Sequence, residues 1–454
     1  MAQGGERFRR PLPDLFGPPR AQPRPGARDR ALDGDHSAAA PTRLPGDGAG
    51  WGGLSSVEAV LRTLAIENYR SLRHLVLPLT SLNVVTGANG SGKSSLYRSL
   101  RLLADGARNG MVSALAREGG LPSTLWAGPE VIGRAVREGR YPVQGTASRR
   151  QSVALKLGFG EDDFGYAIDL GLPTETETAT AFSRDPVIKR ESVWSGPILR
   201  PSTVLCDRLG PFVRVREDDG GWSAPFPIRA YDSMLSEFAD PERAPELLSL
   251  RDRIRSWRFY DQFRTDAAAP ARTSQIGTRT PVLNHDGSDL AAALQTIREI
   301  GDGAAVDAAV DAAFPGSSLT VSTAEDGRVS VHLHQHGLLR PLEAAELSDG
   351  TLRYLLWIAA LLSPRPASLL VLNEPETSLH PELLPPLGRL ISEAATRTQV
   401  IAVSHAASLI NAVAGAAEAD ATELTAIELV KEFGETRVLG TEPLGGPSWA
   451  WPKR

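Results

Sequence analysis

The feature that most constrains this chain is a glycine-rich loop between a short strand-like run and a helical pattern. The run from Ser81 to Thr86 is rich in β-forming residues, and Gly87-Ala-Asn-Gly-Ser-Gly-Lys-Ser94 follows it directly. From Ser94 to Ala104 the apolar residues recur at helical spacing. The sequence therefore predicts a strand, a tight loop and a helix, which together form one unit of an α/β fold.

The loop fits the P-loop pattern, in which inward-turned backbone amides and a helix N-terminus surround phosphate oxygens. Lys93 is expected to place its ammonium on the β- and γ-phosphates of ATP, and the Ser94 hydroxyl is expected on Mg²⁺. An ordinary glycine-rich turn is the alternative, but chance rarely places a lysine here because only 5 of the 49 basic residues are lysines. The candidate ATP ligands are Gly87, Ala88, Asn89, Gly90, Ser91, Gly92, Lys93, Ser94 and Ser95.

A second motif follows a fully apolar strand, Ser368 to Leu372, which ends in Asn373-Glu374. Open α/β sheets bind ligands at the carboxyl ends of their strands. We expect Glu374 to be the general base for the water that attacks the γ-phosphate, although such a carboxylate is also an ordinary exposed group. Asn373 is expected at the metal through a water molecule. Because an amide lacks charge, we predict weak Mg²⁺ binding and slow turnover.

Two further positions are candidates for the same chemistry. Ser348-Asp-Gly350 precedes a helix at Leu352, so Ser348 and the amides of Asp349 and Gly350 form a second phosphate-ready helix N-terminus. The same three residues also describe an ordinary N-cap. His405 ends a strand 31 residues after Glu374 and is a candidate contact for the γ-phosphate and the attacking water, although lone histidines are more often structural.

The remaining pattern predicts the fold class. Residues 150–230 alternate strand-like runs with turns, 233–263 and 289–314 show helical patterns, and hairpins are expected at 319–335 and 425–439. Apolar strands that alternate with helices indicate a parallel sheet covered on both faces. We predict an α/β P-loop NTPase with a mostly parallel sheet, helices on both faces, an antiparallel β subdomain and an inserted lobe.

The order of the motifs resembles that of an ABC-type ATPase head. Ile66-Glu-Asn-Tyr-Arg-Ser71, which leads into the loop, is similar to the opening of the RecF/SMC group of ATPases. Asn373-Glu-Pro-Glu-Thr-Ser-Leu-His-Pro381 is similar to the Walker B block of RecF-like and OLD-type predicted AAA-family ATPases. The similarity covers about 61–105 and 340–445, is weak between them, and is absent from 1–50.

The resemblance implies specific roles. Ser348 to Gly350 become the signature loop, Glu374 the base, His405 the switch histidine, and Ser378 to His380 the loop that crosses a dimer interface. In ABC-type heads the signature of one subunit closes on the nucleotide of the other, so the resemblance also implies a homodimer formed on ATP binding. The cofactors implied are ATP and Mg²⁺.

Three departures from the family pattern concern hydrolysis more than the fold. Asn373 replaces the usual aspartate, and the signature is Leu-Ser-Asp-Gly-Thr. No glutamine is assigned to the Q-loop, for which Gln144 and Gln151 are the candidates.

The motif positions predict a tail and one split domain. Residues 1–56 are rich in proline, glycine and arginine and are expected to be disordered. Residues 57–454 are expected to form one ATPase domain, with a Walker A lobe at 57–110, an inserted lobe at 111–340, and the signature, Walker B and histidine at 341–454. Because 105–340 lacks sustained heptads, a long coiled-coil arm is excluded.

For function, the leading hypothesis is a RecF-like ATPase that acts on DNA in repair or genome maintenance. Arg251 to Arg279 holds 7 arginines against 3 aspartates, with Trp257, Phe259, Tyr260 and Phe263 interleaved, as contacts with backbone phosphates and stacked bases require. An amphipathic helix that packs these aromatics inward is the alternative for this stretch. The second hypothesis is a signalling or anti-phage defence ATPase that controls a partner protein. A nuclease or other effector is expected on a separate chain.

Composition sets the remaining limits. The 454 residues are 41% hydrophobic and carry a net charge of −5, which disfavours a histone-like binder. Cys206 is the one cysteine, so no internal disulfide forms. The densest apolar run, Tyr354 to Leu362, is about half of what spans a bilayer, and no apolar signal segment is found at the start. We therefore expect a cytoplasmic protein without a membrane partner.

Overall fold

A computed structural model describes residues 60–108, 110–129, 154–173, 182–238, 240–440 and 447–454. The predicted tail at 1–56 and the two Q-loop candidates, Gln144 and Gln151, lie outside these residues. Among the described residues, no helix combines the length and the apolar character needed to cross a bilayer.

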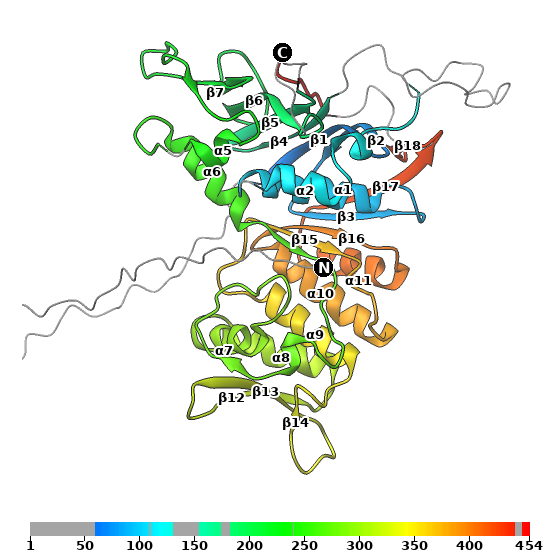
Figure 1. The fold of residues 1–454 in the computed structure, drawn as a ribbon. Helices are drawn as coiled ribbons and strands as arrows, with labels where there is room; N and C mark the ends of the chain where they lie inside the picture. Colours follow the sequence, from blue (N-terminus) through cyan, green and yellow to red (C-terminus); the bar gives the residue numbers. More distant parts are fainter. Residues whose placement is uncertain (1–59, 109, 130–153, 174–181, 239, 441–446) are drawn as a thin grey trace, which may run out of the picture. The chain divides into compact units, whose positions relative to one another are not determined.

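A six-stranded sheet carries the motifs (Figure 1). Its order is β10 (Arg258–Tyr260), β15 (Leu369–Asn373), β16 (Gln399–Val403), β3 (Leu82–Gly87), β17 (Leu424–Glu432) and β18 (Glu435–Val438). The first five strands are parallel, and β18 closes the edge as the antiparallel partner of β17. The carboxyl ends of β3, β10, β15 and β16 therefore share one edge of the sheet, where ligands bind in folds of this kind.

Side-chain alternation along these strands builds a core on each face of the sheet. In β15, Leu369 and Val371 point into one core, and Leu370 and Leu372 point into the other. Because both faces are buried, the strand is apolar throughout. The first core includes α1 (Lys93–Gly106), α2 (Met111–Arg117) and α6 (Pro245–Ser256). The second includes α7 (Leu290–Ile300), α8 (Gly303–Ala313), α9 (Asp349–Leu361), α10 (Leu384–Ala395) and α11 (Ala407–Ala419).

A second, antiparallel sheet faces the first core. Its order is β2 (Leu72–Pro78), β1 (Leu61–Tyr69), β4 (Leu155–Glu161), β5 (Phe164–Gly171), β6 (Val187–Ser195), β7 (Val204–Leu209), β8 (Phe212–Val215) and β9 (Phe226–Pro227). The β1–β2 pair is joined to the later strands through β4. Residues 111–340, expected as an inserted lobe, thus contribute strands to both this sheet and the parallel one.

Strand β6 lies within the range 150–230 predicted to alternate strands and turns, although its middle is polar. Glu191 of β6 is fully buried, where its carboxylate pairs with Arg208 at 3.2 Å. The same carboxylate accepts hydrogen bonds from the Tyr166 hydroxyl and from the backbone amide of Met234. A buried, fully partnered charge pair gives the strand a polar sequence in an interior position.

The third sheet is small and packs beside α7 and α8. The predicted hairpin forms as β12 (Ser318–Thr323) and β13 (Arg328–His334), flanked by β11 (Gln275–Ile276) and β14 (Leu342–Glu343). Short helical segments complete the described fold: α3 (Leu121–Thr124), α5 (Met234–Glu237), η1 (Pro270–Arg272) and η2 (Pro381–Leu383).

The helical prediction for 233–263 is wrong at its C-terminal end. Helix α6 ends at Ser256, and β10 follows as the parallel neighbour of β15. Phe259 contacts Tyr97 of α1 in the first core, whereas Tyr260 contacts Trp357 of α9 in the second. Opposite directions for adjacent side chains are the signature of a strand.

This strand also overturns the predicted nucleic-acid patch. The four aromatic side chains of the predicted patch are at most 3% exposed, so they cannot stack on bases; they are Trp257, Phe259, Tyr260 and Phe263. Neighbouring arginines are engaged within the protein. Arg253 pairs with Glu161 at 2.6 Å, Arg255 donates to the carbonyl oxygen of Ala107, and Arg258 donates to carbonyl oxygens at the end of α6. The aromatics of this stretch belong to the core, and these three arginines lie at its rim.

The Arg253–Glu161 pair yields a stability prediction. Burial raises the pKa of Glu161 to about 7, and the guanidinium of Arg253 counteracts part of that rise. Since this pKa lies above the ordinary value of 4.5, the group favours the folded state below about pH 4.5, and this contribution is lost as the pH rises through 7. Arg253→Ala removes the counter-charge, so we expect a loss of about 3 kcal/mol at about pH 8 and a smaller loss near pH 5.

Urea unfolding of Arg253→Ala and wild type at both pH values measures this difference. Arg251→Ala is the matched control, because its partner Asp252 is exposed, and we expect it to cost less than about 1 kcal/mol at either pH. An equal loss for Arg253→Ala at the two pH values would contradict the assigned pKa.

Candidate active site

The glycine-rich loop runs from the end of β3 into α1, as its sequence predicts. Gly87 has φ +140° and Gly92 has φ +116°, conformations that residues with a Cβ rarely adopt. A Cβ on Gly87 would also lie 2.3 Å from the carbonyl oxygen of Leu429, and one on Gly92 would lie 2.3 Å from Oγ1 of Thr436. The β17–β18 hairpin therefore presses directly on the loop, and only glycine fits at these two positions.

Lys93 lies within the loop. Its ammonium donates hydrogen bonds to the carbonyl oxygens of Gly87 at 2.6 Å and Ala88 at 3.2 Å, and the residue is buried. The Thr436 hydroxyl hydrogen-bonds to the carbonyl oxygen of Ser91, which fixes the other side of the loop. Rigid backbone of this kind holds amides and ammonium in place for an anion.

A hollow of about 290 Å³ brings the loop together with Glu374, 281 residues later in the sequence. Three cationic residues line it along with that carboxylate, so it suits a phosphorylated ligand bound with a metal ion. Its lining residues are Arg70, Ser71, Asn89, Gly90, Gly92, Lys93, Ser94, Ser95, Glu374 and Lys431. Arg70, Ser71 and Lys431 were not among the predicted ligands, although Arg70-Ser71 belongs to the Ile66–Ser71 block and Lys431 is one of the five lysines.

Glu374 is held by backbone contacts at the end of β15. Its amide donates to the carbonyl oxygen of Val403 at 2.8 Å, and its own carbonyl oxygen accepts from the amide of Thr377 at 3.0 Å. The residue has φ +50°, which is uncommon for a side chain of this size. Strained backbone that is held by its surroundings is typical of functional positions. The expected base thus lies at the loop in a fixed conformation.

Asn373 and Ser94 line a neighbouring hollow of about 660 Å³, with Asp261 and Gln262 of the β10 end. The Asn373 side-chain amide donates a hydrogen bond to Asp261 at 2.9 Å. Among the described residues, no three His, Cys, Asp or Glu side chains gather as a metal cage. Mg²⁺ needs no such cage, since it keeps several waters and binds one or two carboxylates together with phosphates. The Ser94 hydroxyl and the Asn373 amide oxygen can accept its water shell, and the Asp261 carboxylate lines the same hollow.

His405 follows β16 and is held by Glu376, which was not among the predicted site residues. Nδ1 of His405 lies 3.2 Å from Oε1 of the buried Glu376. The same carboxylate oxygen accepts hydrogen bonds from the Ser404 hydroxyl at 2.7 Å and the His405 amide at 2.9 Å. His405 does not line the hollow at the loop. The Glu-Pro-Glu spacing is the one sequence signal that marks Glu376.

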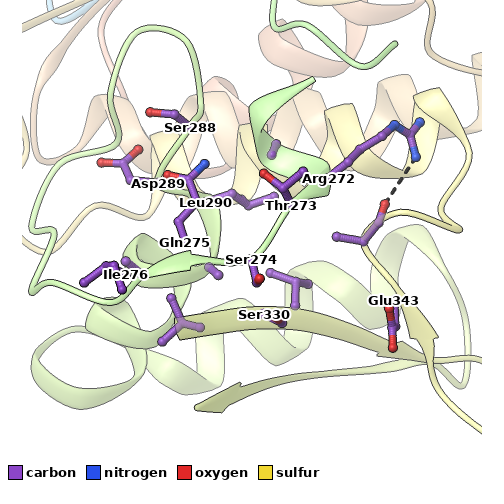
Figure 2. A pocket seen from close by; sticks show the side chains of 16 residues that line it. Arg272, Thr273, Ser274, Gln275, Ile276, Ser288, Asp289, Leu290, Ser330 and Glu343 are labelled. Atoms are coloured by element: carbon purple, nitrogen blue, oxygen red, sulfur yellow. Dashed lines mark hydrogen bonds between the residues drawn. The ribbon is translucent and has the colours of Figure 1, made fainter. Parts of the chain in front are cut away.

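The predicted signature residues lie at the start of α9, away from the P-loop hollow. Ser348 caps the helix by accepting a hydrogen bond from the Thr351 amide at 3.1 Å. Asp349 pairs with Arg272 at 2.6 Å, and Arg272 also donates to the carbonyl oxygen of Leu347 at 2.7 Å. Figure 2 shows Arg272 at the edge of a separate hollow of about 140 Å³, between η1, β11 and β13.

Within one chain, the structure does not bring Ser348, Asp349 or Gly350 to the residues that line the loop hollow. Gly350 lies instead beside Ser378, because a Cβ on it would meet the Ser378 carbonyl oxygen at 3.4 Å. Ser378 is exposed and has φ +60°. Gly350 of the signature and Ser378 of the expected interface loop are therefore adjacent, and Ser348, Asp349 and Ser378 are exposed.

Comparison with known proteins assigns the family. Residues 82–411 match the family described as "AAA domain, putative AbiEii toxin, Type IV TA system". The chain belongs to this family. The matched range of this AAA-domain protein holds the loop, Glu374 and His405, and the match confirms the expected AAA-type ATPase. No curated protein matches the chain.

Solved structures to which this AAA-domain protein is similar include three SMC heads. An SmcHead bound to the C-winged helix domain of ScpA is 12% identical, with 84% of this chain and 97% of that chain covered and a TM-score of 0.46. The Smc head with an extended coiled coil, bound to the C-terminal domain of ScpA, from Pyrococcus furiosus is 12% identical, with 84% and 96% covered and a TM-score of 0.43. The SMC head domain from Thermotoga maritima is 14% identical, with 84% and 99% covered and a TM-score of 0.41.

Proposed function

We propose that this AAA-domain protein binds ATP with Mg²⁺, hydrolyses it slowly, and forms a homodimer in which each site uses residues of both copies. One observation carries the proposal. The loop and Glu374 line one hollow, whereas Ser348 and Asp349 are exposed, Gly350 is half-buried, and none of the three lines that hollow. A second copy related by twofold symmetry would supply the signature to each loop and create two equivalent sites.

The chemistry of each site follows from its side chains. Lys93 and the loop amides bind the phosphates, and Glu374 accepts a proton from the attacking water. Mg²⁺, held by Ser94 and through water by Asn373, would neutralise phosphate charge when bound. His405, positioned by Glu376, supplies a further polar contact for the γ-phosphate. Because Asn373 is uncharged, slow turnover is expected, which suits a switch better than a motor.

For the target of the switch, we propose a partner protein in anti-phage defence. The family description names a toxin of a toxin–antitoxin system, which favours a defence role. The DNA-directed alternative has lost its support in the sequence, because the aromatics of 251–279 are buried and several of the arginines there are engaged. Repair or genome maintenance then rests on the RecF-like resemblance alone. An effector or nuclease on another chain, in the cytoplasm, is the class of partner we infer.

Mixing two inactive variants tests the shared site. Lys93→Ala damages the loop, and Ser348→Arg blocks the signature. Each alone should lack ATPase activity. In a 1:1 mixture about half of the dimers hold one of each, and such a dimer retains one intact site of its two. We therefore expect roughly a quarter of the wild-type rate to return.

Circular dichroism and thermal unfolding of each variant control for folding, since loss of the Ser348 cap alone costs about 1 kcal/mol. A mixture that is as inactive as its two components would contradict the proposal that each site uses residues of both copies. Activity in Ser348→Arg alone would mean that one chain suffices. Salt-dependent binding of duplex DNA by the wild type would restore the DNA alternative.

A further inference from the structure

We propose that Asp261 supplies the negative charge that this chain lacks at Asn373, and that it holds the water shell of the nucleotide-bound Mg²⁺. This inference rests on the proposed ATP site and deepens it. The starting observation is chemical, because a neutral amide at the end of β15 provides an oxygen but no charge for a divalent cation. Mg²⁺ sites of this kind use one or two carboxylates.

Asp261 is positioned by the strand pairing. Strand β10 is parallel to β15, with Phe259 opposite Val371 and Tyr260 opposite Leu372. Continuing this register by one residue places Asp261 opposite Asn373. Both residues thus leave the sheet at the same edge, although 112 residues separate them in the sequence. Asp261 stands where a carboxylate from the neighbouring strand reaches the same space as residue 373.

The contact between the two residues fixes the amide. Nδ2 of Asn373 donates to Oδ1 of Asp261 at 2.9 Å, so the Asn373 oxygen lies on the opposite side of its amide group. Oδ2 of Asp261 and the Asn373 oxygen are then two acceptors for metal-bound water, and together they carry one negative charge. Ser94 lines the same hollow, so the expected metal hydroxyl and the carboxylate face a common space.

The other charged groups of this hollow leave Asp261 available. Glu118 is engaged by Arg70 at 2.6 Å, and Asp105 lies 4.0 Å from Arg117. Arg98 and Arg101 of α1 also line the hollow. Within the described part of the chain, no cationic side chain lies within 4.0 Å of the Asp261 carboxylate. Among these residues Asp261 therefore forms no ion pair, and its carboxylate is available to a cation that binds together with the nucleotide.

Mg²⁺ titration of nucleotide binding tests the inference, with a fluorescent ATP analogue as the probe and Mn²⁺ electron paramagnetic resonance as a direct readout of the metal. We expect Asp261→Asn to raise the Mg²⁺ concentration for half-maximal binding by about 10-fold or more, as outer-shell substitutions at metal sites do. Binding measured in EDTA should stay unchanged. Exchanging the two residues, in Asp261→Asn/Asn373→Asp, should bring the Mg²⁺ requirement back to within about 3-fold of wild type.

Glu325→Gln, which removes one exposed carboxylate from the β12–β13 turn, is the matched control and should leave the titration unchanged. An Asp261→Asn titration identical to wild type would overturn the inference while leaving the ATP site intact. Equal weakening of Asp261→Asn with and without Mg²⁺ would also overturn it, because the residue would then support the nucleotide or the fold. Failure of the wild type itself to bind the analogue would instead refute the proposed function.

Discussion

Lys93→Ala should abolish ATP binding, raising the dissociation constant at least about 100-fold. The Lys93 ammonium lies inside the loop, where it donates to the carbonyl oxygens of Gly87 and Ala88. Charge-assisted hydrogen bonds to phosphate contribute about 1.5 to 3 kcal/mol each, and losing two of them corresponds to about two powers of ten or more in affinity. Isothermal titration with ATP and Mg²⁺ measures this change.

Lys431→Ala is the matched control for charge. Lys431 lines the same hollow but belongs to β17, at its rim, so we expect at most about a 10-fold loss. Lys93→Ala also removes two contacts within the loop, so thermal unfolding must show that the variant is folded. Retention of wild-type affinity by a folded Lys93→Ala protein would exclude the hollow as the ATP site.

Glu374→Gln should retain ATP binding and lower the turnover rate by about 100-fold or more, the usual effect of removing a general base. Glutamine keeps the size and the backbone contacts of the residue, and only the proton acceptor is lost. Since hydrolysis would then no longer open the shared sites, ATP-bound dimers should accumulate. Size-exclusion chromatography with and without ATP, together with phosphate release, measures both effects.

Glu382→Gln is the control for this substitution, because Glu382 follows closely in the chain, is exposed, and is 3.6 Å from His380. It should hydrolyse ATP at the wild-type rate and show no additional dimer. If Glu374→Gln also hydrolyses ATP at that rate, Glu374 is not the base. If it loses hydrolysis but stays monomeric with ATP, the base assignment holds and the shared site does not.

Much of the parallel sheet can be predicted from the sequence, because each central strand is apolar on both faces and stops at a glycine, a carboxylate or a histidine. Strand β10 escaped prediction for a physical reason. It is three residues long and directly follows α6, so its aromatics extend the apolar spacing of that helix. Only the pairing with β15 distinguishes this strand from a continuation of the helix. A pairing between residues that lie more than 100 positions apart has no local signal in the sequence.

The residues of the candidate site also divide into those that local motifs predict and those that they do not. The loop and Glu374 belong to local motifs, and the sequence predicts them as one site. Three other residues are recognised as part of the site only through neighbours that lie far away in the chain or on another strand; they are Asp261, Glu376 and Lys431. A buried carboxylate such as Glu376 has no periodic pattern of its own, and its contacts to Ser404 and His405 exist only once β15 and β16 pair.

The contact of the β17–β18 hairpin with the glycine-rich loop, made through Thr436, has a consequence for biosynthesis. Thr436 contacts Ser71 and Ser91, so a loop made from residues 87–94 gains its final support from a residue translated about 340 positions later. Ribosomes add roughly 5 to 20 residues each second, so the emerging loop lacks its contact with Thr436 for some tens of seconds. Nascent chains should therefore be unable to capture nucleotide until the hairpin has left the exit tunnel.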